Sequence, residues 1–170
     1  MRESSDINPA RTLHRLLKLN NRLLQPFSVY LEHQHKISVN EFRLLMMIGR
    51  MQVTASHELA ELTGVNTMSV SRAVSALRRH GRVNVTQDPS NRRRKTLTLT
   101  AEGTRLYRAM LPATDKVARY LFEALRIDEM MAFDRYLRVL IAALEARDEQ
   151  GRSVFLERTR PDGIEPPGSG

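Results

Sequence analysis

The sequence predicts a mainly helical fold of the α+β class, with one short β-hairpin between helices. Apolar residues recur at helical spacing over most of the 170 residues, as expected of amphipathic helices. After Gly81 the pattern changes to period two, which is typical of strands; its apolar members are Val83, Val85, Leu97 and Leu99. With 41% hydrophobic and 27% charged residues, the chain has the composition of a protein that buries a core.

The first two helices are predicted over residues 10–35 and 39–50. In the first, leucines such as Leu13, Leu16 and Leu17 recur at helical spacing with basic residues between them. Ser38 stands directly before the second apolar run. Its side-chain oxygen can accept a hydrogen bond from a free N–H group of the first turn, so we expect it to be the N-cap.

A helix-turn-helix pattern follows over residues 54–81. Gly64 interrupts the apolar pattern and can adopt the left-handed conformation that ends a helix. Asn66 or Thr67 then provides an N-cap for a second helix, which we expect to reach about His80. Two short helices joined by such a turn are typical of DNA-binding domains.

Two strands and a basic turn are predicted after the second helix. Residues 88–91, Asp-Pro-Ser-Asn, have strong turn propensity and separate the two segments of period two. Residues 92–95, Arg-Arg-Arg-Lys, follow at once. We therefore expect a two-stranded hairpin with a basic tip, a wing beside the helix-turn-helix.

The C-terminal part of the chain returns to helical spacing. A long helix is predicted from residue 101, with Leu106 and Met110 on its apolar stripe. Asp128 is predicted to cap a last helix. From about residue 149 Gly, Pro, Ser and charged residues dominate, so we expect residues 149–170 to form a flexible tail.

The second helix of the helix-turn-helix has two chemically different faces. Val70, Ala73, Val74 and Leu77 recur at helical spacing and are expected to pack inward. The outward face is then polar, and consists of Thr67, Met68, Ser69, Ser71, Arg72, Ser75 and Arg79. Short hydroxyl side chains let a helix approach the major groove, and an arginine can reach a guanine edge or a phosphate. The alternative is a solvated polar face on a helix that only packs.

A basic cluster favours the DNA-binding interpretation. From Arg78 to Lys95 the sequence has seven basic residues and one acidic residue, and such a cluster repels itself unless an anion lies nearby. A narrow minor groove attracts arginine, which makes Arg92, Arg93 and Arg94 candidate DNA contacts. A solvated basic loop is the alternative. The net charge of +8 agrees with double-stranded DNA as the partner.

Three segments together resemble the MarR family of transcriptional regulators: residues 58–67, 69–81 and 88–103. The resemblance extends over about residues 10–148, and it is most specific in the wing and in the Leu-Thr-x-x-Gly run after it. It implies a winged helix-turn-helix homodimer, a repressor that binds a pseudo-palindromic operator. Residues 38–100 would be the DNA-binding domain, and residues 10–37 and 101–148 a helical dimerisation region.

The wing departs from the pattern of the family at three positions. Asn91 stands where the family usually has an aspartate that braces the wing arginine, Ser90 where an arginine is frequent, and Val85 where an arginine is also common. Arg93 corresponds to the wing-tip arginine of the family, and Arg92 can substitute for it. The sequence leaves open which of the two enters the minor groove.

The resemblance also implies a small-molecule effector, an aromatic or phenolic acid, in a pocket between the terminal helices and the winged domain. Cations on an apolar helix can hold a carboxylate, and the first helix offers His14, Arg15, Lys18 and Arg22. A solvated basic face explains these residues equally well. We therefore assign no effector-binding residues.

Other functional classes find little support. The chain has no cysteine, which excludes disulfides, thiolate metal sites and thiol redox sensing. It has no Gly-rich phosphate loop and no Gly-x-Ser-x-Gly motif, so we expect neither an enzyme nor a cofactor. No apolar run is long enough to span a membrane, and we expect a cytoplasmic protein without a membrane partner.

Two histidine motifs are weak metal candidates. His33 and His35, two residues apart, point to different sides of a helix. His57 and Glu58 could begin a His-Glu-x-x-His motif, but Glu61 stands where its second histidine belongs. We therefore expect no metal site.

Two further classes of function are alternatives to a DNA-binding regulator. A winged helix can serve as a protein-interaction module whose basic tip binds an acidic protein surface. RNA binding is the other alternative, although 5% aromatic residues offer few platforms for base stacking.

Overall fold

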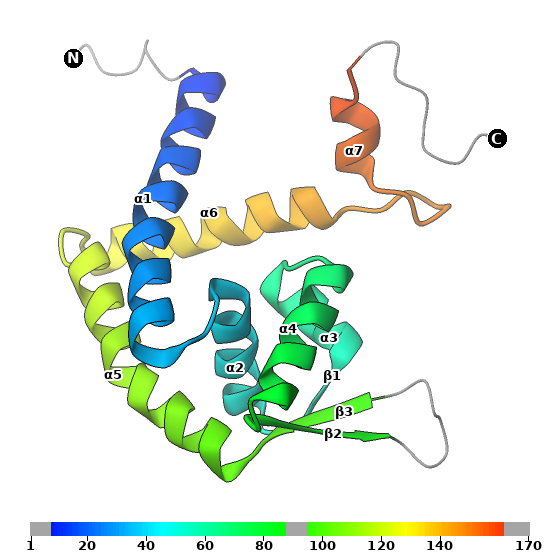
Figure 1. The fold of residues 1–170 in the computed structure, drawn as a ribbon. Coiled ribbons are helices and arrows are strands. Elements are labelled where there is room, and N and C mark those ends of the chain that lie inside the picture. Colours follow the sequence, from blue (N-terminus) through cyan, green and yellow to red (C-terminus); the bar gives the residue numbers. More distant parts are fainter. Residues whose placement is uncertain (1–7, 88–94, 162–170) are drawn as a thin grey trace. The chain divides into compact units, whose positions relative to one another are not determined.

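The computed structural model describes residues 8–87 and 95–161. The chain forms two compact units, residues 1–114 and 115–170. Figure 1 shows several helices and one small sheet, which confirms the predicted fold class. The described elements that begin in the first unit are α1 (Pro9–His35), α2 (Val39–Met51), β1 (Thr54–Ala55), α3 (Ser56–Thr63), α4 (Thr67–Arg79), β2 (Val83–Gln87), β3 (Lys95–Leu99) and α5 (Ala101–Phe122).

The first two helices begin at side-chain caps. The Asn8 side chain accepts a hydrogen bond from the Ala10 N–H at 2.9 Å, which holds the start of α1. At α2, Ser38 Oγ accepts from the Glu41 N–H at 3.2 Å, while the Glu41 carboxylate accepts from the Ser38 N–H at 2.9 Å. This reciprocal capping box confirms the predicted N-cap.

Helices α3 and α4 form the predicted helix-turn-helix. α3 ends at Gly64, whose φ of +65° lies in the left-handed region that glycine adopts without steric cost. Of the two candidate caps for α4, Asn66 is the one in use, because its side chain accepts from the Ser69 N–H at 2.9 Å. α4 ends at Arg79, with His80 as its C-cap, within a residue of the predicted end.

The sheet has three antiparallel strands in the order β1-β3-β2, one strand more than predicted. In the central strand β3, Leu97 pairs with Thr54 of β1 on one side and with Val85 of β2 on the other. The prediction that the segment from residue 54 is helical is therefore wrong at its start. β1 has only two residues, too few to show an alternating pattern, and it is held by its partner strand.

The core of the first unit gathers around α2. This helix contributes Leu44, Leu45 and Ile48, each fully buried. Other elements contribute the buried residues Leu31 (α1), Leu59 (α3), Leu77 (α4), Leu97 (β3) and Met110 (α5). The ring of Phe27 in α1 meets that of Phe42 in α2 edge-on, at a centroid distance of 4.8 Å. These contacts hold the last part of α1, whereas residues 9–23 of the same helix are exposed.

In its described part, the second unit holds the end of α5, followed by α6 (Ile127–Glu145) and α7 (Val154–Thr159). The prediction that Asp128 caps α6 is wrong, because the N-cap residue is Arg126. The Arg126 N–H donates to the Glu129 carboxylate at 2.8 Å, so the helix begins before Asp128. Asp128 lies in the first turn and pairs with the Arg126 side chain.

Helix α7 lies within the segment predicted as a tail. Its N-cap is Ser153, whose side chain accepts from the Leu156 N–H at 3.3 Å. A turn tied by Asp148 precedes it, in which the carboxylate accepts from the N–H groups of Gln150 (2.9 Å) and Arg152 (2.8 Å). Residues 162–170 of the predicted tail lie outside the described residues. Within the described ranges, no helix has the length and apolar character needed to cross a membrane.

Candidate nucleic-acid interface

Helix α4 buries one face and exposes the other. Val70, Ala73 and Leu77 are 3%, 5% and 0% exposed, and Val74 is half-buried against the same core. The predicted inward face is confirmed. These contacts fix the rotation of α4 about its own axis, so the opposite face points to solvent.

Six of the seven outward residues predicted on α4 are exposed: Thr67, Met68, Ser71, Arg72, Ser75 and Arg79. Ser69 is half-buried, and its N–H is bound by the Asn66 cap. The first turns of α4 thus present hydroxyl side chains and one apolar side chain, Met68, at 67% exposure. Hydroxyls can bind base edges or phosphates, and an apolar group can contact a thymine methyl. Their contact with DNA remains a prediction.

The wing is described up to the paired ends of its strands. β2 and β3 keep an unbroken antiparallel register as far as Gln87 and Lys95. Residues 88–94, which link these ends, include the predicted contacts Arg92, Arg93 and Arg94 and lie outside the described residues. The described hairpin therefore provides the base of the wing, and the role of its tip remains a prediction.

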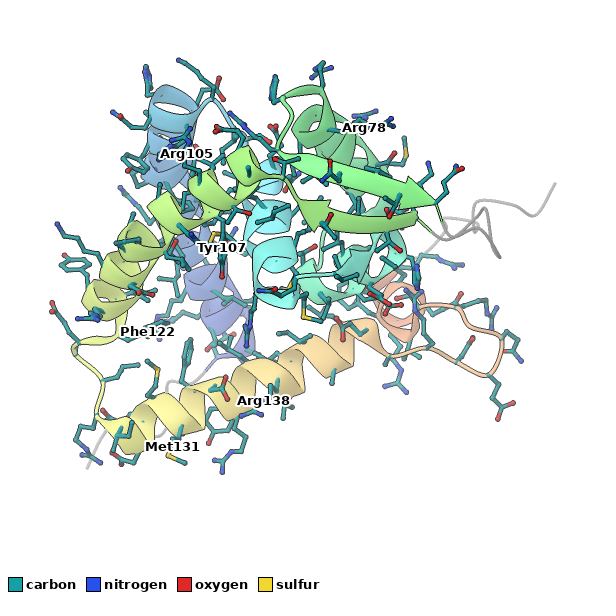
Figure 2. The ribbon with its side chains drawn as sticks, turned by 90° about the horizontal axis from the view of Figure 1, so that it is seen from below. Arg78, Arg105, Tyr107, Phe122, Met131 and Arg138 are labelled. Atoms are coloured by element: carbon teal, nitrogen blue, oxygen red, sulfur yellow. The ribbon has the colours of Figure 1, made fainter. Side chains whose placement is uncertain are left out.

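Basic side chains near the end of α4 divide into two groups. Arg78 and Arg79 lie in the last turn of α4 and are exposed. Figure 2 labels Arg78 on this helix. Arg82, which the sequence groups with them, binds elsewhere: its guanidinium donates to the carbonyls of His35 (2.8 Å) and Lys36 (3.2 Å) at the end of α1. No local pattern predicts this contact, because its partners are 47 and 46 residues away.

The start of α5 packs closely against the base of the wing. Thr100 Oγ1 accepts from the Gly103 N–H at 3.0 Å and donates to the Gly81 carbonyl at 2.7 Å. A Cβ at Gly103 would lie 1.9 Å from the Arg82 carbonyl oxygen, a distance at which only glycine fits. The Leu-Thr-x-x-Gly run thus joins the wing to the following helix.

Three of the four basic candidates for an effector site lie together on α1. His14, Lys18 and Arg22 line an open depression of about 430 Å³, and Arg15 does not. Every residue around this depression belongs to α1, so a second element must close it before it can enclose a ligand. For a metal, residues 8–87 and 95–161 contain no group of three histidine or acidic side chains placed to hold an ion.

Comparisons with known proteins agree with these features. The model of the MarR family matches residues 37–95, which confirms the resemblance seen in the sequence. No curated protein matches the chain. Among solved structures, a MarR/EmrR family transcriptional regulator from Acinetobacter sp. ADP1 is similar with a TM-score of 0.71 and 21% identity, over 79% of this chain and 95% of that one.

Two further solved structures share the fold. FabT from Streptococcus pneumoniae, in complex with DNA, is similar with a TM-score of 0.66 and 20% identity, over 81% of this chain and 98% of FabT. BpsR from Bordetella bronchiseptica, whose DNA binding is regulated by 6-hydroxynicotinic acid, is similar with a TM-score of 0.66 and 22% identity, over 76% of this chain and 98% of BpsR. Residues 37–95 therefore carry a MarR-family domain, and the chain has the fold of the MarR-family transcriptional regulators.

Proposed function

We propose that the protein is a sequence-specific DNA-binding transcriptional regulator. It acts as a repressor that binds a pseudo-palindromic operator as a homodimer and releases it when a small-molecule effector binds. The observation that carries the proposal is the exposed polar face of α4, kept outward by the burial of Val70, Ala73 and Leu77. A helix so oriented fits the major groove, where the edges of the base pairs differ. Such a regulator works in the cytoplasm.

Double-stranded DNA is the partner that charge and shape favour. Arg72 on the exposed face can reach base edges, while Arg78 and Arg79 at the end of α4 can neutralise phosphates. Residues 92–94 add three arginines on the wing, which suit the minor groove. FabT was solved in complex with DNA, and this supports the same use of the fold here.

Homodimerisation is favoured by apolar residues that the chain leaves uncovered. In α1, Leu13, Leu16 and Leu17 are 56%, 42% and 54% exposed. α6 exposes a second set, Val139, Leu140, Ile141 and Leu144. Groups of large apolar side chains exposed side by side in one helix are typical of association surfaces. We propose that residues 10–37 and 101–148 pair with the same regions of a second copy, and that residues 38–100 form the DNA-binding domain.

The proposed effector is an aromatic or phenolic acid. Its carboxylate needs a cationic partner, and His14, Lys18 and Arg22 border one depression on α1. The regulation of DNA binding in BpsR by 6-hydroxynicotinic acid supports an acid of this kind. Binding beside the dimerisation helix would alter the DNA affinity through the position of the winged domain.

A binding selection followed by titration tests the proposal. The purified protein selects duplexes from a library of genomic fragments, and fluorescence anisotropy then measures the affinity of the enriched site at rising salt. We expect a pseudo-palindrome whose log affinity falls with log salt, with a slope of about −0.9 for each phosphate neutralised. An affinity that does not depend on the salt concentration, or that is equal for every duplex, would contradict the proposal. It would favour the protein-interaction module.

A further inference from the structure

Arg82 connects three elements of the first unit at one point. Its Nη2 donates to the His35 carbonyl at 2.8 Å, and its Nη1 donates to the Lys36 carbonyl at 3.2 Å. Its main chain is also held: the N–H donates to the Leu77 carbonyl at 2.8 Å, and the carbonyl accepts from the Thr100 N–H at 3.1 Å. One residue thus joins the end of α1, the end of α4 and the start of α5.

The two carbonyls bound by the guanidinium lie where α1 ends, and the last carbonyls of a helix have no partners within that helix. Lys36 is in the left-handed region, with φ of 52°, a conformation that residues other than glycine rarely adopt. The guanidinium satisfies both carbonyls and places a positive charge at the negative end of the helix dipole. It therefore holds the end of α1 in one geometry.

The main chain of Arg82 has little room to move. Gly81 before it has φ of +65° and donates its N–H to the Arg78 carbonyl at 2.9 Å, which closes the turn after α4. On the other side, Gly103 of α5 approaches so closely that a Cβ there would lie 1.9 Å from the Arg82 carbonyl oxygen. The end of α1 is therefore tied through Arg82 to the turn after α4 and to the start of α5.

The charge of Arg82 acts on a neighbouring carboxyl group of the first unit. The pKa of the Glu102 carboxyl in α5 is lowered by its hydrogen bonds from Arg105, and the charges of Arg105 and Arg82 lower it further. Arg79, three positions before Arg82, is exposed at the end of α4. The two arginines have the same charge, but Arg79 is exposed whereas Arg82 is half-buried and bound to α1. Arg79 is therefore a matched control for Arg82.

We propose that Arg82 is a positioning residue for DNA recognition: it locks the end of α1 to the end of α4 and so sets the distance between the two recognition helices of the dimer. The inference rests on the proposed function, in which α1 pairs with a second copy and α4 enters the groove. Half-sites of an operator lie about one helical turn, roughly 34–36 Å, apart. If the contact between the ends of α1 and α4 is lost, the dimer should therefore discriminate less between operators of different half-site spacing. Its contact with each single half-site should stay intact.

The first experiment measures, in the absence of DNA, how firmly Arg82 holds the end of α1 in place relative to the helix-turn-helix. Because the chain has no cysteine, cysteines introduced at exposed His33 on α1 and Glu61 on α3 can be spin-labelled selectively. Diluted into unlabelled protein, the sample gives the distance distribution within one chain. We expect Arg82→Leu to broaden it, Arg82→Lys to restore it in part, and Arg79→Leu to leave it unchanged. An unchanged distribution in Arg82→Leu that is folded by circular dichroism would overturn the proposal.

The second experiment compares single half-sites with operators of altered spacing. Arg82→Leu is expected to lose about tenfold in affinity for the full operator and most of its preference for one spacing. Its affinity for a single half-site and its salt slope should stay unchanged. Arg79→Leu should instead weaken every site and reduce the salt slope by about 0.9 for each phosphate that it no longer neutralises, one on a half-site and two on the full operator. An equal loss by Arg82→Leu on half-sites and full operators would overturn the proposal. If the wild type selects no palindrome, the proposed function fails. The spin-label result still decides whether Arg82 holds the end of α1 to the end of α4.

Discussion

At the scale of single residues, arginines close together in the sequence have different partners. Arg79 is exposed at the end of α4, whereas Arg82 is half-buried and bound to two carbonyls of α1. Arg72 lies on the exposed face of the same helix whose Leu77 packs into the core. The role of each arginine follows from the groups around it, and a count of basic residues along the chain does not separate them.

Arg72 provides a direct test of base reading. We expect Arg72→Ala to cost about 1–3 kcal/mol of binding free energy for each half-site and to relax the preference at one base position of each half-site, because one contact to a base edge has about this value. Anisotropy titrations against the operator and its single-base variants measure both effects. Arg158→Ala, which removes an exposed arginine from α7, is the control. A uniform loss on all duplexes would assign Arg72 to a phosphate.

Gly103 and Gly64 form a matched pair for a stability test. A Cβ at Gly103 would meet the Arg82 carbonyl oxygen at 1.9 Å, whereas a Cβ at Gly64 would meet nothing within 4 Å but would stand on a left-handed main chain. Gly64→Ala should cost about 1–2 kcal/mol of unfolding free energy. Gly103→Ala should cost more, about 3 kcal/mol, since the main chain must move. Urea unfolding measures both, and equal losses would contradict the close approach at Gly103.

Caps and turns at this scale are predictable where the rule is local. Ser38 and Gly64 follow rules that involve only the next few residues, and the structure agrees with both. The prediction for Asp128 is wrong because Glu129, its neighbour, binds the Arg126 N–H and starts the helix earlier. The partners of Arg82 could not be predicted, since folding brings them together from distant parts of the chain.

At the scale of elements, length decides what the sequence can predict. The first helix is predicted over residues 10–35 and is observed over Pro9–His35, because many turns of amphipathic spacing define it. β1 has two residues and α7 has six, too few for either period to be visible. β1 forms because β3 is available to pair with it, which no local pattern reports.

The arginines of the wing allow a test of whether the wing contributes to DNA binding. We expect the double change Arg92→Ala with Arg93→Ala to weaken all operator sites by a similar factor, since arginine in the minor groove reads shape and potential. The salt slope should fall by about 0.9 for each phosphate that the variant no longer neutralises. The two single variants show which arginine carries the effect, and Arg50→Ala with Arg158→Ala controls for the removal of two charges. Unaltered affinity in the wing variant would exclude the wing as a DNA contact.

The turn before α7 gives a prediction about pH. Hydrogen bonds from Arg152 and Gln150 lower the pKa of Asp148 below its ordinary value of 3.8, the main-chain N–H of Arg152 first. A carboxyl whose pKa is lower in the folded state stabilises the turn fully above about pH 4 and loses this effect as the pH falls through its folded pKa. Amide NMR shifts of Gln150 and Arg152 should therefore titrate with a midpoint below 3.8. In Asp148→Asn this titration should vanish; a midpoint at or above the ordinary value would contradict the geometry of the turn.

At the scale of the whole chain, basic and acidic residues are unevenly distributed along the sequence. Residues 1–100 carry 16 basic and 7 acidic side chains, and residues 101–170 carry 11 and 12. Exposed large apolar residues are frequent in α1 and α6. A nearly neutral surface can associate with its own copy without strong repulsion, while the basic part attracts DNA. The near neutrality of residues 101–170 agrees with the place of residues 101–148 in the proposed dimerisation region, whereas α1, its other part, is basic.

The proposed dimer makes one strong interaction out of two weak half-site contacts, and its disruption should be measurable. Deletion of residues 127–170 removes α6 and α7, and the operator affinity should fall to the non-specific range, on the order of 10⁻⁴–10⁻⁶ M at physiological salt. Leu140→Asp with Leu144→Asp is the milder variant: both residues are more than half exposed, so the single chain should stay folded while the partner surface becomes charged. Glu145→Gln, at the end of the same helix, is the control and should stay dimeric. Sedimentation and anisotropy together decide the matter, because a full-length protein that is monomeric at micromolar concentration and still binds a palindrome tightly would contradict the dimer.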